Sequence, residues 1–201
     1  MSAPRILAFA GSLRKESYNK KLVQIAAGAA RRAGAEATFV DLKDYPLPIY
    51  DGDLEASSGL PDNALKLKKL FLEHDGLLLA CPEYNSSITA VLKNTIDWVS
   101  RPAPTEASLA CYAGKVATLM SASPGALGGL RGLVHVRAIL GNINVIVLPE
   151  QIAVNKAHEA FNAEGTLKDA KQQAGIEALG AGLASFLSKL KAWPDQQNHA
   201  R

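Results

Sequence analysis

Short apolar runs, each the length of one β-strand, alternate along this chain with longer stretches in which apolar residues recur at helical spacing. Strands that alternate with helices imply crossover connections, which make successive strands parallel in one sheet with helices on both faces. The runs are almost continuously apolar, as expected for a parallel sheet buried on both sides. Five of them are predicted to be strands: Ile6–Ala10, Ala37–Val40, Gly76–Cys81, Val116–Met120 and Asn144–Leu148.

The amphipathic stretches between these runs predict the helices that cover the sheet. One helical face holds Leu22, Ala26, Ala29 or Ala30, and Ala33, and a later one holds Leu92, Ile96 and Val99. The last face, which would pack the C-terminal part onto the sheet, holds Ile176, Leu179, Leu183, Phe186 and Leu190. We expect a single α/β domain over residues 1–193, a long surface loop over residues 43–62 and a frayed tail over residues 194–201.

Charge, cysteine content and hydropathy limit the kinds of partner and the compartment that the chain can have. Its net charge is +3 and its 22 basic residues are spread along the sequence, which argues against nucleic-acid binding. Cys81 and Cys111 lack CxxC spacing and are expected to be buried free thiols, typical of a reducing compartment. No apolar run approaches the ~20 residues of a membrane span or forms a signal-peptide core. We therefore expect a cytoplasmic protein that does not contact membranes.

The polar loop after the first predicted strand is a candidate ligand-binding loop. In a doubly wound sheet of order 2-1-3-4-5, ligands bind beyond the carboxyl ends of the first and third strands. The loop, GSLRKESYN, lacks the glycines of a dinucleotide or Walker loop but contains Ser12, Arg14, Ser17 and Asn19. Hydroxyls, a guanidinium, an amide and a helix N-terminus are the donors that a phosphate monoester needs. Alternatively, Ser17 or Asn19 only caps the following helix.

Two further loops follow the third and fourth predicted strands. After the third strand, Pro82 prevents further ladder bonding, and Glu83, Tyr84 and Asn85 follow, offering an aromatic face and amide dipoles to a flat ring. After the fourth strand, residues 121–129 read SASPGALGG, and such small residues let the backbone approach a ligand closely. Either loop alone is equally well explained as an ordinary turn. All three loops at one sheet edge indicate a binding site.

These loops resemble those of the NADPH-dependent FMN reductase family, which includes quinone, chromate and azo-dye reductases. The resemblance rests on GSLRKESYN, PEYNSSITAVLKNTIDWVSRP and GKVATLMSASPGALGGLRG, which occur in this order within about residues 6–150. It implies a flavodoxin-like fold, bound FMN, NADPH or NADH as co-substrate, and a homodimer or homotetramer with the flavin near the interface. Two departures, the Ser-Ser-Ile-Thr segment after Asn85 and Pro124, fall near the open face of the ring and bear on the choice of acceptor.

The resemblance also assigns residues to parts of FMN. Those placed at the phosphate are Ser12, Arg14, Ser17 and Asn19. Those placed around the isoalloxazine ring are Pro82, Glu83, Tyr84, Asn85 and, on the third side, Ser123. No catalytic side chain is expected, because hydride transfer between nicotinamide and flavin is chemistry of the cofactors. The implied activity is two-electron, ping-pong reduction of quinones or similar small acceptors, with chromate, azo dyes and free flavin as alternatives.

Other ionisable residues are weaker candidates. Arg131, His135 and Arg137 fall on a predicted helix and could reach an acceptor or a dinucleotide phosphate, although an ordinary, partly exposed helix face explains them better. The two histidines His158 and His199 have no partner at metal-ligand spacing, so no metal site is predicted.

Two rival functions fit the same fold. A flavodoxin-like electron carrier would bind FMN without dehydrogenase activity of its own, but such carriers tend to be acidic to dock with basic partners. This chain has a pI near 8.8 and an arginine in its phosphate loop, which favours the reductase. The third possibility is a flavin-free regulatory α/β domain.

Overall fold

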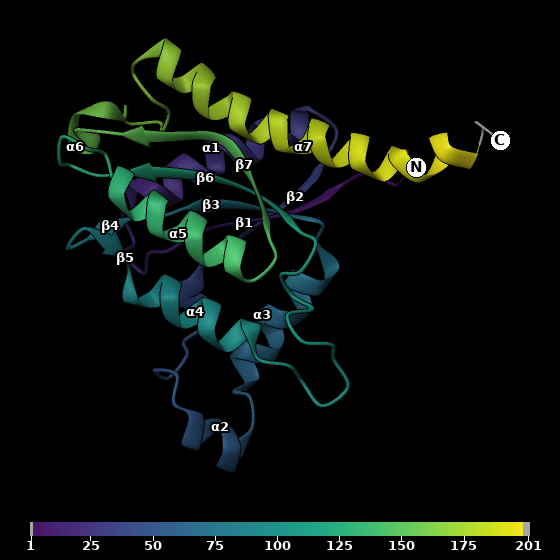
Figure 1. Ribbon diagram of the computed structural model, residues 1–201. Coiled ribbons are helices and arrows are strands. Elements are labelled where there is room, and N and C mark those ends of the chain that lie inside the picture. Colours follow the sequence, from purple (N-terminus) through teal and green to yellow (C-terminus); the bar gives the residue numbers. More distant parts are fainter. Residues whose placement is uncertain (1, 199–201) are drawn as a thin grey trace.

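Five parallel strands form the central sheet in the computed structural model, which describes residues 2–198 (Figure 1). The strands are β1 (Arg5–Ala10), β2 (Glu36–Val40), β3 (Gly76–Ala80), β6 (Val116–Ala122) and β7 (Ile146–Val154). Their order is β2-β1-β3-β6-β7, and all neighbouring pairs are parallel. This order is the predicted 2-1-3-4-5, so the flavodoxin-like α/β fold is confirmed.

Helices cover both faces of the sheet (Figure 1). On one face lie α1 (Tyr18–Arg32) and α7 (Ala170–Asn198), and on the other α3 (Asp62–Glu73), α4 (Ala90–Ser100) and α5 (Leu130–Asn142). Successive side chains of a strand point to opposite faces. Ile6 and Ala8 therefore pack in the core with α1 and α7, whereas Leu7 and Phe9 pack with α3 and α4. The central strands β1, β3 and β6 are buried at nearly every position, which explains their almost continuous apolar runs.

The apolar face of α7 differs from the predicted one at its C-terminal half. Ile176, Leu179 and Leu183 are buried as predicted, but Phe186 and Leu190 are 39% and 45% exposed. Leu187 is buried instead, because its Cδ1 fills the space over Gly76, where a Cβ would lie only 2.6 Å from it. The prediction for Phe186 and Leu190 was therefore wrong. Ala33, predicted on the inner face of α1, is exposed because the helix ends at Arg32.

The last strand, β7, lies further along the chain than the predicted Asn144–Leu148. It pairs with β6 through Ala117↔Val147 and then through Leu119↔Gln151, so three residues of β7 bulge opposite one residue of β6. The guanidinium of Arg137 donates to the carbonyls of Val147, Leu148 and Pro149 and to the Gln151 side chain at 2.9–3.4 Å. Pro149 is tolerated because β7 is an edge strand. Strand pairing thus resumes at Gln151, beyond Pro149 and beyond the predicted strand end at Leu148.

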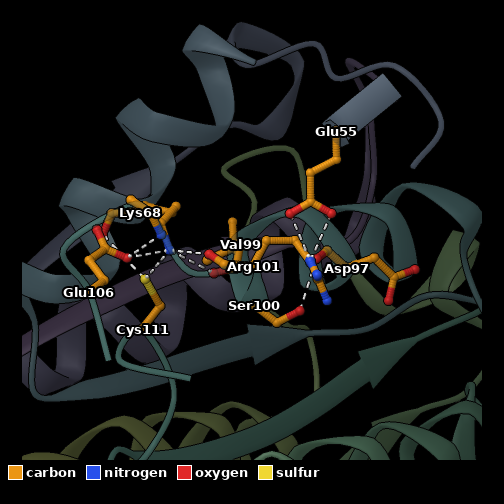
Figure 2. Close-up of polar contacts among 9 residues, drawn as sticks. Glu55, Lys68, Asp97, Val99, Ser100, Arg101, Glu106 and Cys111 are labelled. Carbon is orange, nitrogen blue, oxygen red and sulfur yellow. Dashed lines mark hydrogen bonds and ion pairs between the residues drawn. The ribbon is translucent and has the colours of Figure 1, made fainter. Parts of the chain in front are cut away.

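The predicted surface loop over residues 43–62 contains structure. The 3₁₀ turn η1 (Leu42–Asp44) enters it, and the short helix α2 (Gly52–Ser58), none of whose residues is buried, lies within it. Glu55 of α2 accepts hydrogen bonds from the Arg101 guanidinium at 2.9 and 3.0 Å (Figure 2). It also accepts one from the Tyr50 hydroxyl. The indole of Trp98 donates to the carbonyl of Pro48 at 2.8 Å. These contacts hold the segment against α4.

The C-terminal helix α7 is described as far as Asn198. Residues 199–201, which include His199, lie outside the described residues, so the frayed tail over residues 194–201 stays a prediction. The single domain over residues 1–193 does as well. Within residues 2–198, none of the helices combines the length and apolar character needed to span a membrane.

Candidate functional site

The carboxyl ends of the sheet strands lie on the side of the molecule that also carries the hairpin β4 (Glu83–Tyr84) and β5 (Ser87–Ile88) and the short helix α6 (Ala157–Ala160) (Figure 1). The three predicted loops meet there and form one pocket. Its lining residues are Ser12, Arg14, Ser17, Tyr18, Asn19, Pro82, Glu83, Tyr84, Ala122, Ser123 and Pro124. Eight of the nine predicted site residues thus come together, and Asn85 lies outside the lining.

Gly11 brings the first loop into close contact with α4. A Cβ at this position would lie 2.9 Å from the Cβ of Leu92 and 3.2 Å from the Oγ1 of Thr89. The Thr89 hydroxyl donates to the Gly11 carbonyl at 2.7 Å and also accepts from the Leu92 amide as the N-cap of α4. The buried Thr89 therefore holds the start of the first loop against the start of α4.

Three serine hydroxyls in the pocket share one hydrogen-bonding pattern. Ser12 Oγ accepts from the Arg14 amide, Ser17 Oγ from the Lys20 amide and Ser123 Oγ from the Gly125 amide, at 3.3–3.4 Å. A hydroxyl that accepts from the backbone still has its own proton to donate. Ser17 is the N-cap of α1, which was one of its two predicted roles, and it also lines the pocket. The serines can thus present O–H donors to an anion at a helix N-terminus.

Asn19 joins the first loop to the third. Its side-chain amide donates to the Ala122 carbonyl at 2.8 Å, and its side-chain oxygen accepts from the Ala122 amide at 2.9 Å. The residue is 4% exposed, and the two partners are 103 positions apart. Both polar atoms are therefore engaged with the backbone, which makes Asn19 the residue that positions α1 against the end of β6. The residue type at position 19 indicated an amide donor, but no local pattern indicated Ala122 as its partner.

We expect Asn19→Ala to lower the free energy of unfolding by about 2 kcal/mol or more, because a buried amide and a buried carbonyl of Ala122 lose their partner. Asn162→Ala is the matched control: its two side-chain atoms also make two hydrogen bonds, both with exposed Thr166. Urea unfolding of the flavin-free proteins measures both changes. Equal losses in the two variants would show that burial at Asn19 contributes nothing.

The second loop is a two-residue hairpin. Glu83 pairs with Ile88 and Tyr84 with Ser87, and the two turn residues Asn85 and Ser86 have φ angles of 51° and 68°. Two successive positive φ angles are typical of a type I′ turn, where asparagine is favoured at the first position. The turn explains the residue type at Asn85, which lies exposed at the tip. Tyr84 is 55% exposed at the mouth of the pocket.

Glu83 fastens the hairpin to α5 rather than pointing freely into the pocket. Its carboxylate accepts from the Arg131 amide at 3.0 Å, the Gly132 amide at 3.2 Å and the Arg131 guanidinium at 2.8 Å. Burial alone would raise the pKa of Glu83, but the bonds from Arg131 and Gly132 outweigh it and lower the pKa. Glu83 therefore stays ionised, with its charge compensated by Arg131 and by the N-terminus of α5.

The glycines of the third loop serve packing within the protein rather than approach to a ligand. Gly128 and Gly129 have φ angles of 62° and 95°. A Cβ on Gly128 would lie 2.7 Å from the carbonyl carbon of Val154, and one on Gly129 would lie 2.9 Å from the Cβ of Ser121. The Ser121 hydroxyl donates to the Gly128 carbonyl at 2.8 Å. Ala122, Ser123 and Pro124, at the start of the loop, are the part that lines the pocket.

The remaining candidates have structural partners. His135 Nδ1 lies 2.9 Å from the hydroxyl of Ser87, which joins α5 to the hairpin. Arg137 binds the bulge of β7, as described above, and Arg131 pairs with Glu83. Cys81 is fully buried, and burial raises the pKa of its thiol to about 12. A thiol with that pKa is not a nucleophile at neutral pH, in agreement with the packing role expected for it.

Comparison with known proteins identifies the family. Residues 4–159 match the family model of NADPH-dependent FMN reductases. The chain belongs to this family. An NAD(P)H-dependent FMN reductase of Pseudomonas aeruginosa is 34% identical over 188 residues, which cover 93% of this chain and 97% of that protein. An NAD(P)H:quinone oxidoreductase of Solanum tuberosum is 35% identical over 193 residues, which cover 93% and 94%. The solved structure of the flavoenzyme NAD(P)H:(acceptor) oxidoreductase FerB of Paracoccus denitrificans superimposes with a TM-score of 0.77 at 28% identity, covering 92% of this chain and 98% of FerB.

As a member of the FMN reductase family, the chain is an oxidoreductase that uses FMN and NAD(P)H. The donor set of the pocket fits FMN, because a doubly charged phosphate needs hydroxyl donors, a guanidinium and a helix N-terminus. The pocket encloses about 60 Å³, enough for a group of phosphate size. An adjoining cavity of about 400 Å³ shares Ser12, Arg14 and Tyr84 with it and has room for a larger group.

Proposed function

We propose that this FMN reductase uses NADPH or NADH to reduce quinones or similar small acceptors, with FMN held by the three-loop pocket. The observation that carries the proposal is the convergence of Ser12, Ser17 and Arg14 at the N-terminus of α1. The names of several relatives, including the quinone oxidoreductase of Solanum tuberosum, support quinones as the acceptor class.

In this proposal, the chain binds and orients while the cofactor supplies the redox chemistry. When bound, FMN would supply the hydride-transfer chemistry between the nicotinamide and the acceptor. Ser12, Arg14 and Ser17 would hold the phosphate, and Asn19 joins the first loop to the third through its two bonds to Ala122. Pro82, Tyr84 and Ser123 would flank the ring, with the hairpin kept in place by Glu83. No side chain is needed as acid or base.

We infer the kinetic order from the one cavity that adjoins the three-loop pocket. Tyr84 is exposed beside the cavity of about 400 Å³, so the nicotinamide and the acceptor approach from the same side. The oxidised nicotinamide then leaves before the acceptor enters, which is a ping-pong sequence.

We expect the FMN-loaded protein to oxidise NADPH or NADH over many turnovers when a quinone is supplied, with parallel double-reciprocal lines at several quinone concentrations. Steady-state absorbance at 340 nm measures this. Converging lines would contradict a shared face. Flavin that is reduced by dithionite but not by either nicotinamide would identify an electron carrier instead of a reductase.

An exposed apolar surface beside the three-loop pocket supports the proposal of a homodimer or homotetramer. Exposed apolar side chains, Leu13, Tyr84, Leu127, Leu130 and Val134, gather on the first loop, the hairpin, the third loop and the start of α5. The three-loop pocket is too small to cover the flavin ring. A second copy of the chain over this surface would shield the ring from solvent. Trp98 of α4 is fully buried in its own chain and does not contribute to this surface. Sedimentation at micromolar concentration tests the proposal, and a fully active monomer would refute it.

We also propose a cytoplasmic location. Cys81 and Cys111 are both buried free thiols, as the sequence predicted, and such thiols persist in a reducing compartment. Cell fractionation with antibodies against the protein tests this location.

A further inference from the structure

A cavity separate from the three-loop pocket and its adjoining cavity lies between β7 and α7, on the face of the sheet opposite α5. It has a volume of about 380 Å³, within the range of small-molecule sites. Its walls are mainly aliphatic, with Leu148 and Ile152 from β7 and Leu179 and Leu183 from α7. None of the three flavin-site loops contributes to it.

Two features of the chain create this cavity. The β7 bulge places three residues opposite Thr118 alone, and a bulge of this kind bends the strand locally. Across the gap, α7 presents Gly175, Ala178 and Gly182, which are spaced along one helix face and leave it without bulky side chains.

Close packing does not explain Gly182. A Cβ there would meet no atom within 4 Å, whereas a Cβ on Gly180 would lie 1.9 Å from the Ala26 carbonyl oxygen. Glycine inside a helix is destabilising relative to alanine, so it is expected where the space it leaves is used. For Gly180, that use is the contact with α1. For Gly182, the space it leaves is the cavity.

Thr118 of β6 lies at the inner wall of the cavity, and its buried hydroxyl is the second, independent observation. Thr118 is 1% exposed, and its Oγ1 has no hydrogen-bond partner among the residues that the structure describes. A buried hydroxyl without a partner is costly, and valine would fill the same volume without that cost. A polar group on a ligand would supply the missing bond.

We propose that this cavity binds an uncharged, mainly apolar molecule of one or two rings whose single carbonyl or hydroxyl group hydrogen-bonds to Thr118. The aliphatic walls select the apolar body, and the Thr118 hydroxyl, which can donate or accept, selects the polar group. The carboxylate of Glu150 at the lining disfavours an anionic ligand. This site is separate from the proposed quinone reduction and does not depend on it.

The probe for the test is 4-methylphenol, with toluene as its counterpart without the hydroxyl. Both are titrated into FMN-loaded protein labelled with ¹⁵N-glycine, and the amide signals of Gly175 and Gly182 are followed. We expect these two signals to shift, while those of Gly11 and Gly129 at the flavin-site loops stay in place. Shifts at Gly11 and Gly129 instead, or none up to the solubility limit, would overturn the proposal.

Two variants separate the hydroxyl from the cavity. Thr118→Val keeps the shape and should weaken 4-methylphenol binding about threefold to tenfold, the effect of one neutral hydrogen bond, while toluene binding stays unchanged. Gly182→Leu fills the cavity and should abolish binding of both, with NADPH oxidation unchanged. Unaltered 4-methylphenol affinity in Thr118→Val, or retained binding in Gly182→Leu, would refute the assignment even if the other variant failed to fold.

Discussion

Replacing Arg14 with alanine is expected to lower the affinity for FMN by tenfold or more and to leave riboflavin binding unchanged. Arg14 lines both the three-loop pocket and the adjoining cavity. No ion pair or side-chain hydrogen bond engages its guanidinium within the described residues, so it is free to bind a phosphate. A hydrogen bond to a charged group contributes about 1.5–3 kcal/mol, which corresponds to at least a tenfold change in affinity.

The matched control for Arg14→Ala is Lys15→Ala. Lys15 is the next residue and carries the same charge, but it lines neither the pocket nor the adjoining cavity. Its replacement should change FMN affinity only through the general electrostatic field, which salt screens. Fluorescence titration of the flavin-free proteins with FMN and with riboflavin measures all four affinities. Equal losses in the two variants, or an equal loss for riboflavin, would show that Arg14 does not contact the phosphate.

The sequence predicted the sheet because each strand is encoded locally. Buried parallel strands require continuous apolar runs, and each of the five predicted runs overlaps one strand of the sheet. Where geometry depends on distant residues, the prediction was wrong or incomplete. Leu187 rather than Phe186 is buried because of Gly76, which is far away in the sequence. The bulge of β7 depends on Arg137, whose role no local pattern indicates.

Most residues that line the candidate pocket were predictable from the sequence, but the hydrogen bonds among them were not. The loops were located by a topological rule, since the carboxyl ends of neighbouring parallel strands meet at one edge. The structure adds that Asn19 binds Ala122 and that Glu83 binds the start of α5, contacts across 103 and 48 positions. Tyr18 also lines the pocket, and its position between Ser17 and Asn19 was the available signal.

Glu106→Gln is expected to lower the free energy of unfolding more than the loss of a carboxylate from any exposed ion pair. The ammonium of Lys68 is almost completely buried and lies 2.7 Å from the Glu106 carboxylate (Figure 2). It also donates to the carbonyls of Arg101 at 2.6 Å and Val99 at 3.3 Å and lies 3.5 Å from the sulfur of Cys111. This cluster ties α3 to the segment that follows α4.

Removing the carboxylate charge leaves a buried ammonium with carbonyl partners only. We expect a loss of about 2–4 kcal/mol in the free energy of unfolding, between the values for a charged hydrogen bond and a broken buried ion pair. Asp97→Asn is the control, since the Lys93–Asp97 pair has the same 2.7 Å separation but a half-exposed lysine. That change should cost no more than about 0.5 kcal/mol.

The pH dependence of the Glu106 effect gives a second measurement. The hydrogen bond from Lys68 lowers the pKa of Glu106 below its ordinary value of 4.5, against the opposing effect of burial. A carboxylate whose pKa is lower in the folded than in the unfolded protein stabilises the fold above the unfolded pKa. That contribution is lost as the pH falls from about 4.5 through the folded pKa. The stability difference between the wild type and Glu106→Gln should therefore be full at pH 7 and shrink progressively below pH 4.5, as measured by urea unfolding. A difference that stays constant down to pH 3 would show that the charge of Glu106 does not stabilise Lys68.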